Sequence, residues 1–146
     1  MAVIDHWHPV CRVAALRRGP AGVTIDSHRI AVFRTAAGAL GAVDEVCPHR
    51  HMRLSLGTVC GERLQCKYHG WTYDAQGNGE SPATPKLQAC ARAFEVIERF
   101  EAIWVRNPGA TTQFPSFDVD GYIPSQCRGP HKWTAIASRE KRHHCL

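Results

Sequence analysis

The sequence predicts an all-β domain made of small antiparallel sheets. Three pairs of strand-like runs are each joined by a short turn, which is the pattern of β-hairpins. No segment of about 10–12 residues has a convincing helical period. The 146 residues are enough for one domain and too few for two of ordinary size.

The three predicted hairpins account for most of the expected strands. They pair residues 30–34 with 40–44, residues 58–60 with 63–65, and residues 94–98 with 102–105. In the first hairpin, Gly38 is expected in the left-handed conformation that glycine adopts most readily. In the third, alternation indicates one buried face. Of the connecting segments, 74–80 is rich in turn residues, 81–85 is stiffened by two prolines, and 86–93 could hold one helical turn.

The formal net charge of +5 is concentrated near the C-terminus. Residues 125–146 contain five Lys or Arg and one Glu, a balance of +4, so the remaining residues carry +1. We expect a domain over residues 1–108, followed over 109–146 by a linker-like segment and a basic, disordered tail. Aromatic residues do not interleave with the basic ones, so the charge does not predict nucleic-acid binding.

The cysteines and the hydropathy favour a cytoplasmic protein. No run approaches the roughly 18–20 apolar residues that span a bilayer, and the N-terminal residues lack the pattern of a secretory signal. The chain has seven cysteines, an odd number. When Cys47 and Cys66, which belong to the metal-binding motifs described below, are set aside, the other five show no paired spacing. This pattern favours reduced thiols over a disulfide framework. We expect Cys60 and Cys90 to be small buried side chains.

Four residues form two short motifs that predict a metal centre. Cys47-x-His49 is followed, after sixteen residues, by Cys66-x-x-His69. Two thiolates on one iron and two imidazoles on the other are the ligand set of a Rieske-type [2Fe–2S] cluster. Gly70 lets the backbone come close to such a cluster.

A structural zinc ion is the main alternative for this donor set. Two Cys and two His also suit tetrahedral zinc. Zinc fingers usually group Cys with Cys and His with His, whereas each short motif here combines one of each. The mixed pairs therefore favour the iron–sulfur cluster.

Three segments carry a family resemblance. Residues 47–50 (CPHR), 54–57 (LSLG) and 66–74 (CKYHGWTYD) resemble the N-terminal Rieske domain of Rieske non-haem iron oxygenase α subunits, which include ring-hydroxylating dioxygenases and O-demethylases. The resemblance covers about residues 7–108. It implies the Rieske fold with two cluster loops at one tip, and Cys47, His49, Cys66 and His69 as the ligands, with His69 as the electron exit. His51 is expected to be exposed rather than an additional ligand.

Respiratory Rieske proteins are a second resemblance. They carry an extra cysteine in each cluster loop, joined as a disulfide, and a serine that hydrogen-bonds the cluster. This chain has Met52 and Tyr68 at the cysteine positions and Trp71 at the serine position. The oxygenase type fits better, and fewer hydrogen bonds imply a potential below about 0 mV.

The oxygen-activating iron of the family is not encoded in an obvious motif. The resemblance implies an acidic residue and His-x₃₋₄-His, but after His69 the only histidines are His131, His143 and His144.

Two hypotheses about the function stay open. The chain is the Rieske part of an oxygenase that relays electrons to a mononuclear iron domain it lacks, or it is a free-standing Rieske ferredoxin. A flavin or iron–sulfur reductase, or a ferredoxin, is the expected redox partner, with no membrane involved. A non-redox binding module is the third class. Whether the chain is itself an enzyme, and for which substrate, is left open.

Overall fold

The computed structural model describes residues 1–84 and 86–116. Short strands dominate these residues, joined by tight turns and by short 3₁₀ helices. The helices are η1 (Val3–Asp5), η2 (Val13–Arg18) and η3 (Leu54–Leu56). No helix in the described ranges is long and apolar enough to cross a membrane.

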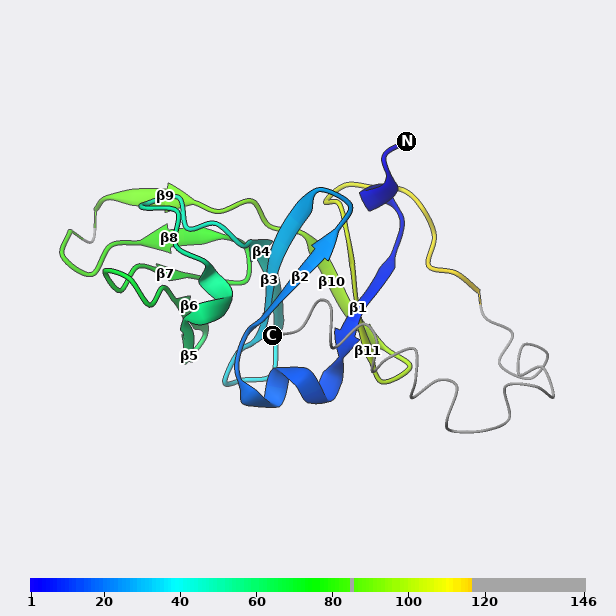
Figure 1. Ribbon diagram of the computed structural model, residues 1–146, viewed down its shortest axis with the longest axis horizontal. Helices are drawn as coiled ribbons and strands as arrows, with labels where there is room; N and C mark the ends of the chain where they lie inside the picture. Colours follow the sequence, from blue (N-terminus) through cyan, green and yellow to red (C-terminus); the bar gives the residue numbers. More distant parts are fainter. Residues whose placement is uncertain (85, 117–146) are drawn as a thin grey trace.

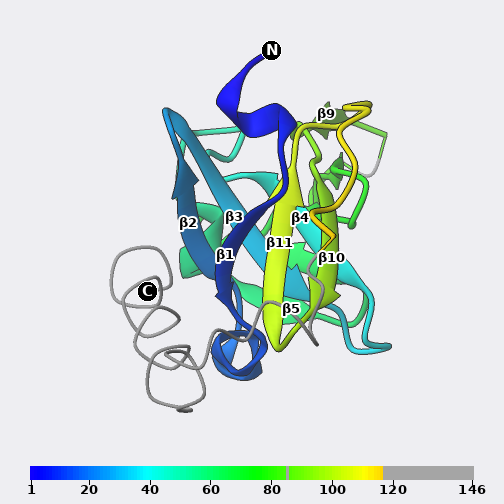
Figure 2. The ribbon, with the colours of Figure 1, turned by 90° about the vertical axis from the view of Figure 1, so that its right-hand side faces the viewer.

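Two three-stranded antiparallel sheets pack face to face (Figure 2). The first has the order β1–β11–β10, with β1 (His8–Arg12), β11 (Ala102–Arg106) and β10 (Glu95–Arg99). The second has the order β2–β3–β4, with β2 (Ala21–Ile25), β3 (His28–Arg34) and β4 (Leu40–Asp44). Apolar side chains from both sheets meet in one core cluster, which includes Val10, Ile30 and Ile103.

A five-stranded antiparallel sheet lies to one side of this sandwich (Figure 1). Its strands follow chain order: β5 (Thr58–Cys60), β6 (Arg63–Gln65), β7 (Thr72–Tyr73), β8 (Asn78–Glu80) and β9 (Gln88–Cys90). Strand β3 serves both halves because successive side chains point to opposite faces. Ile30 and Val32 enter the sandwich core, whereas Ala31 and Phe33 enter a second core under the five-stranded sheet.

The all-β prediction and its three hairpins are confirmed. They correspond to β3–β4, β5–β6 and β10–β11, and Gly38 has a φ of 94°. The helical turn suggested for 86–93 is wrong, since β9 occupies Gln88–Cys90. Cys60 and Cys90 are exposed rather than buried. They lie on β5 and β9, the two edge strands of the five-stranded sheet, where no neighbouring strand covers them.

The outer face of the β1–β11–β10 sheet is covered by the segment that follows β11 (Figure 2). The Phe114 ring packs edge-on against Trp104, with centroids 4.8 Å apart, and also meets Trp7 at 6.0 Å. The Arg99 guanidinium lies 4.6 Å from the centre of the same ring. The tail and the histidines at 131, 143 and 144 fall outside the described residues.

Candidate metal centre

Two loops present the four predicted ligands at the same end of the five-stranded sheet. The first follows β4, and the second connects β6 to β7 (Figure 1). In the first, Cys47 N–H donates to the Met52 carbonyl at 2.8 Å, which closes the loop on itself. In the second, Cys66 N–H donates to the Trp71 carbonyl at 2.6 Å. Each backbone bond fixes a cysteine at the base of its loop.

The second loop turns through two consecutive left-handed residues. His69 has a φ of 69° and Gly70 a φ of 72°. Glycine adopts this conformation freely, but histidine does so at a cost. Strain of this kind at a non-glycine residue is concentrated at functional sites, where the surroundings hold it in place. Here it turns the His69 ring toward the ring of the first loop.

The four predicted ligands form a sulfur pair and a nitrogen pair. Cys47 and Cys66 are each 1% exposed, and burial, followed by the neighbouring Cys47 thiol, raises the pKa of Cys66. His49 and His69 are exposed, and their ring centroids lie 5.0 Å apart. Desolvation and then the nearby His69 and Arg50 lower the pKa of His49, which favours the neutral ring that binds metals.

The arrangement is compatible with the ligand set of a binuclear cluster. Among the residues that the structure describes, no group of three or more His, Cys, Asp or Glu side chains is placed to hold a single metal ion. The donors form one pair inside and one pair at the surface, as a binuclear cluster with separate sulfur and nitrogen ligands requires. A tetrahedral zinc site needs all four at one centre.

Tyr73 lies directly beneath the sulfur pair, a position that the sequence pattern did not reveal. It is 0% exposed, and its hydroxyl lies 3.1 Å from Cys47 Sγ. Gly79 on β8 makes room for the ring, since a Cβ at Gly79 would lie 2.6 Å from Tyr73 Cε1. Burial, and then the bond with Cys47, raises the pKa of Tyr73 well above its usual value. The hydroxyl therefore keeps its proton and can donate it to a thiolate sulfur.

Aromatic rings support the two imidazoles. Trp71 is 4% exposed and stacks on His49, with centroids 5.1 Å apart and planes 22° from parallel. Tyr68, which is partly exposed, lies against His69 with a centroid distance of 3.8 Å. The buried Trp71 ring therefore packs beneath the first loop and also orients a predicted ligand.

Hydrogen bonds and an ion pair from charged side chains stabilise the base of each loop. The buried Glu45 accepts a hydrogen bond from the Ser55 N–H at 2.9 Å and faces Arg53 Nε at 3.9 Å, so it links the two ends of the first loop. Arg63 on β6 donates to the carbonyls of Thr72 at 3.1 Å and Asn78 at 2.7 Å, which ties β6 to β7 and β8. Neither contact is visible in the sequence pattern, because both depend on the three-dimensional pairing of the strands.

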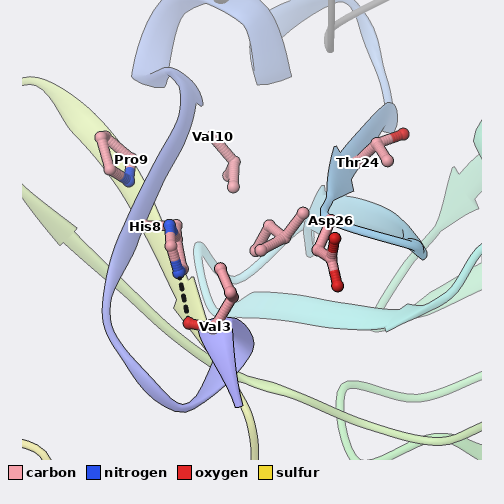
Figure 3. Close-up of a pocket in the computed structure, with 7 residues that line it drawn as sticks. Val3, His8, Pro9, Val10, Thr24 and Asp26 are labelled. Carbon is pink, nitrogen blue, oxygen red and sulfur yellow. Dashed lines mark hydrogen bonds between the residues drawn. The ribbon is translucent and has the colours of Figure 1, made fainter.

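A separate hollow of about 330 Å³ lies between β1 and the end of β2 (Figure 3). It contains His8 and Asp26, but the His8 Nε2–H donates to the Val3 carbonyl at 2.7 Å (Figure 3). That ring is already engaged, and no predicted ligand lines this hollow.

The fold and the donor set together are those of an iron–sulfur electron carrier. Residues 6–100 match the family described as the Rieske [2Fe–2S] domain. The chain belongs to this family, whose domain binds a [2Fe–2S] cluster.

Two members of the family that act as demethylases are similar to this chain in sequence. The chain is 35% identical to methylxanthine N1-demethylase NdmA of Pseudomonas putida, over 91% of this chain and 42% of that protein. It is 32% identical to the oxygenase component of dicamba O-demethylase of Stenotrophomonas maltophilia, over 86% of this chain and 42% of that protein.

Solved structures agree with the sequence comparison. The structure of NdmA from Pseudomonas putida CBB5 superposes with a TM-score of 0.72 at 35% identity, covering 80% of this chain and 39% of the other. Dicamba monooxygenase gives a TM-score of 0.70 at 29% identity, covering 80% and 38%. The resemblance to the Rieske part of oxygenase α subunits is thus confirmed, and the chain spans less than half the length of these relatives.

Proposed function

We propose that Cys47, His49, Cys66 and His69 hold a Rieske [2Fe–2S] cluster through which this chain passes single electrons to the mononuclear non-haem iron of an oxygenase. The observation that carries the proposal is the pair of exposed imidazole rings, 5.0 Å apart, above two cysteines that are each 1% exposed. Sulfur ligands are thereby shielded while the nitrogen ligands face a partner.

The chain's own side chains hold the site in one geometry. Cys47, His49, Cys66 and His69 would hold the cluster, which would supply reversible one-electron transfer. The Tyr73 hydroxyl, 3.1 Å from Cys47 Sγ, would donate to the ligated thiolate and so favour the more negative, reduced state. Trp71 holds the His49 ring in place and excludes water from one of its faces.

The relatives suggest which oxygenases form the other half of the system. NdmA and dicamba O-demethylase are both named for removing methyl groups. We therefore favour a demethylating oxygenase over a ring-hydroxylating one as the electron acceptor. A flavin or iron–sulfur reductase, or a ferredoxin, supplies the electrons. Cys60 and Cys90 are free thiols at the surface, which suits a reducing cytoplasm.

Metal analysis and electron paramagnetic resonance of anaerobically prepared protein test the ligand proposal. We expect two irons and two sulfides per chain and, after reduction, a rhombic signal with an average g near about 1.9, as mixed Cys and His ligation gives. One zinc and no sulfide would reject the cluster.

A second experiment separates the oxygenase role from that of a diffusible Rieske ferredoxin. The reduced protein is added to a demethylating oxygenase, lacking its own Rieske domain, together with a reductase. Turnover that requires about one chain per oxygenase, held in a stable complex, supports the proposed role. Sustained turnover at substoichiometric amounts of the chain supports the free carrier.

A further inference from the structure

A hollow of about 480 Å³ lies on the flank of the second donor loop, beside the sulfur pair. Leu56 and Thr58 form one wall, Gln65 and Lys67 the other, and Cys66 lies between them. Cys66 is only 1% exposed, yet it is among the residues that line this hollow. A partner seated here would therefore lie next to a residue that carries a predicted ligand.

The hollow offers hydrogen-bond donors and no carboxylate. Its lining residues include Lys67, which carries an ammonium group, and Thr58, whose hydroxyl already contacts Cys60 Sγ at 3.9 Å. None of the lining residues is Asp or Glu. The Cys60 thiol donates to Gln65 Oε1 at 3.3 Å, which leaves the amide nitrogen as the free end of that side chain. This nitrogen is turned toward Gly70, where an added Cβ would lie 3.5 Å from it. The Lys67 ammonium and the Gln65 amide nitrogen are donors that suit a carboxylate.

The surrounding loops extend the same charge. Residues 46–53 and 66–71 include Arg50, Arg53 and Lys67 and no acidic residue. Among the residues that the structure places, neither Arg50 nor Lys67 is in an ion pair, and both are exposed. Leu56, which is 49% exposed and lines the same hollow as Lys67, adds an apolar contact. An apolar anchor within a basic rim is the composition of a protein-docking surface.

We propose that the hollow lined by Leu56, Gln65 and Lys67 is the docking surface for an acidic iron–sulfur electron donor, which seats a carboxylate-bearing side chain there. This inference rests on the proposed function and adds to it the surface at which the electron donor binds. The exposed imidazoles of His49 and His69 form a different edge of the site. The donor therefore approaches along Cys66 and leaves the imidazole edge open to the acceptor.

Binding of an oxidised plant-type [2Fe–2S] ferredoxin, an acidic probe, tests the surface without turnover. Isothermal titration of the cluster-loaded protein at low ionic strength compares the wild type with Lys67→Glu. We expect the variant to bind about tenfold more weakly, and the difference to shrink in about 0.5 M salt, because charge reversal replaces attraction by screened repulsion. Leu56→Ala should weaken binding by about threefold at both salt concentrations, since its contact is apolar.

Lys86→Glu is the matched control. Lys86 is also exposed and lies on the loop after β8, but it does not line the hollow. We expect less than a twofold loss of affinity. An equal loss in Lys67→Glu and Lys86→Glu would show a general charge effect and overturn the proposal, as would wild-type protein that does not bind the ferredoxin.

Two further measurements distinguish a failure of the docking proposal from a failure of the proposed function on which it depends. The paramagnetic resonance signal and the rate of reduction by a small uncharged reductant, a photoreduced deazaflavin, should be the same in wild type and Lys67→Glu. A wild-type protein without the signal rejects the proposed function. A wild-type signal combined with unchanged ferredoxin affinity in Lys67→Glu rejects only the docking surface.

Discussion

The Tyr73 hydroxyl lies 3.1 Å from the Sγ atom of Cys47, inside the core beneath the two donor loops. This contact joins the fold to the electronic properties of the site. The ring is held by the second hydrophobic cluster, and its polar end is the part that reaches the predicted ligand.

Tyr73→Phe should lower the midpoint potential of the cluster by about 40 mV. The change removes a hydrogen bond worth about 1 kcal/mol to the reduced state and leaves the ring's packing intact. The wild-type value is expected below about 0 mV, within the range of Rieske centres. Protein-film voltammetry measures both values. An unchanged potential in the variant would mean that the hydroxyl does not act on the sulfur.

Loss of a predicted ligand should abolish cluster assembly rather than tune it. We expect Cys47→Ser and His69→Ala to retain little iron or acid-labile sulfide after anaerobic reconstitution, because each removes one of four donors. His51→Ala is the control, since His51 is an exposed histidine of the first loop that is not in the ligand set. Normal iron content in His69→Ala, or its loss in His51→Ala, would contradict the assignment.

Gly70→Ala should destabilise the protein by about 1–2 kcal/mol and change the resonance spectrum. A Cβ at Gly70 would meet Gln65 Nε2 at 3.5 Å and Pro82 Cγ at 3.6 Å, which are ordinary contacts, so the cost comes from the φ of 72°. Gly61→Ala is matched, because Gly61 has a φ of 58° and open space around it. Thermal melting should show similar losses in both variants, with altered g values only in Gly70→Ala. An unaltered spectrum in Gly70→Ala would show that the loop tolerates the change without moving His69.

Asp74→Asn should lower the thermal midpoint at neutral pH but not in strong acid. Burial acts to raise the pKa of Asp74, but hydrogen bonds from Asn78 and Gln76, together with Arg63, outweigh it and lower the pKa below 3.8. A depressed native pKa stabilises the fold above the unfolded value and loses that effect as the pH falls through the native value. The difference between variant and wild type, about 1 kcal/mol at pH 7, should therefore shrink as the pH falls through the lowered native pKa of Asp74. Melting curves at fixed scan rate across pH 2–7 measure it, and a difference that persists in acid would exclude the carboxylate as its cause.

Local patterns predicted the hairpins well because each is a short-range structure. The β5–β6 pairing needs only two strand-like runs and the Gly61-Glu62 turn between them, and its register follows from the turn. The β10–β11 turn shows the limit of this reasoning. Phe100 and Glu101 both adopt positive φ, 53° and 59°, although neither is the glycine that the conformation favours.

Contacts between segments far apart in the chain could not be predicted from the sequence. The formation of β9, where the sequence suggested a helical turn, depends on pairing with β8, and the exposure of Cys60 depends on β5 being an edge strand. The ligand set could be proposed from spacing alone. Glu45, Arg63 and the Tyr73–Cys47 bond could not, since each requires knowing which strands become neighbours.

Phe114 seals a sheet face that lies at the far side of the sandwich from the donor loops, against Trp7 and Trp104 (Figures 1 and 2). A fluorescent reporter or affinity handle attached to the chain shortly beyond this ring would therefore stand clear of the surface where redox proteins meet. Immobilising the molecule through that point would present every copy to an electrode or a partner in the same orientation.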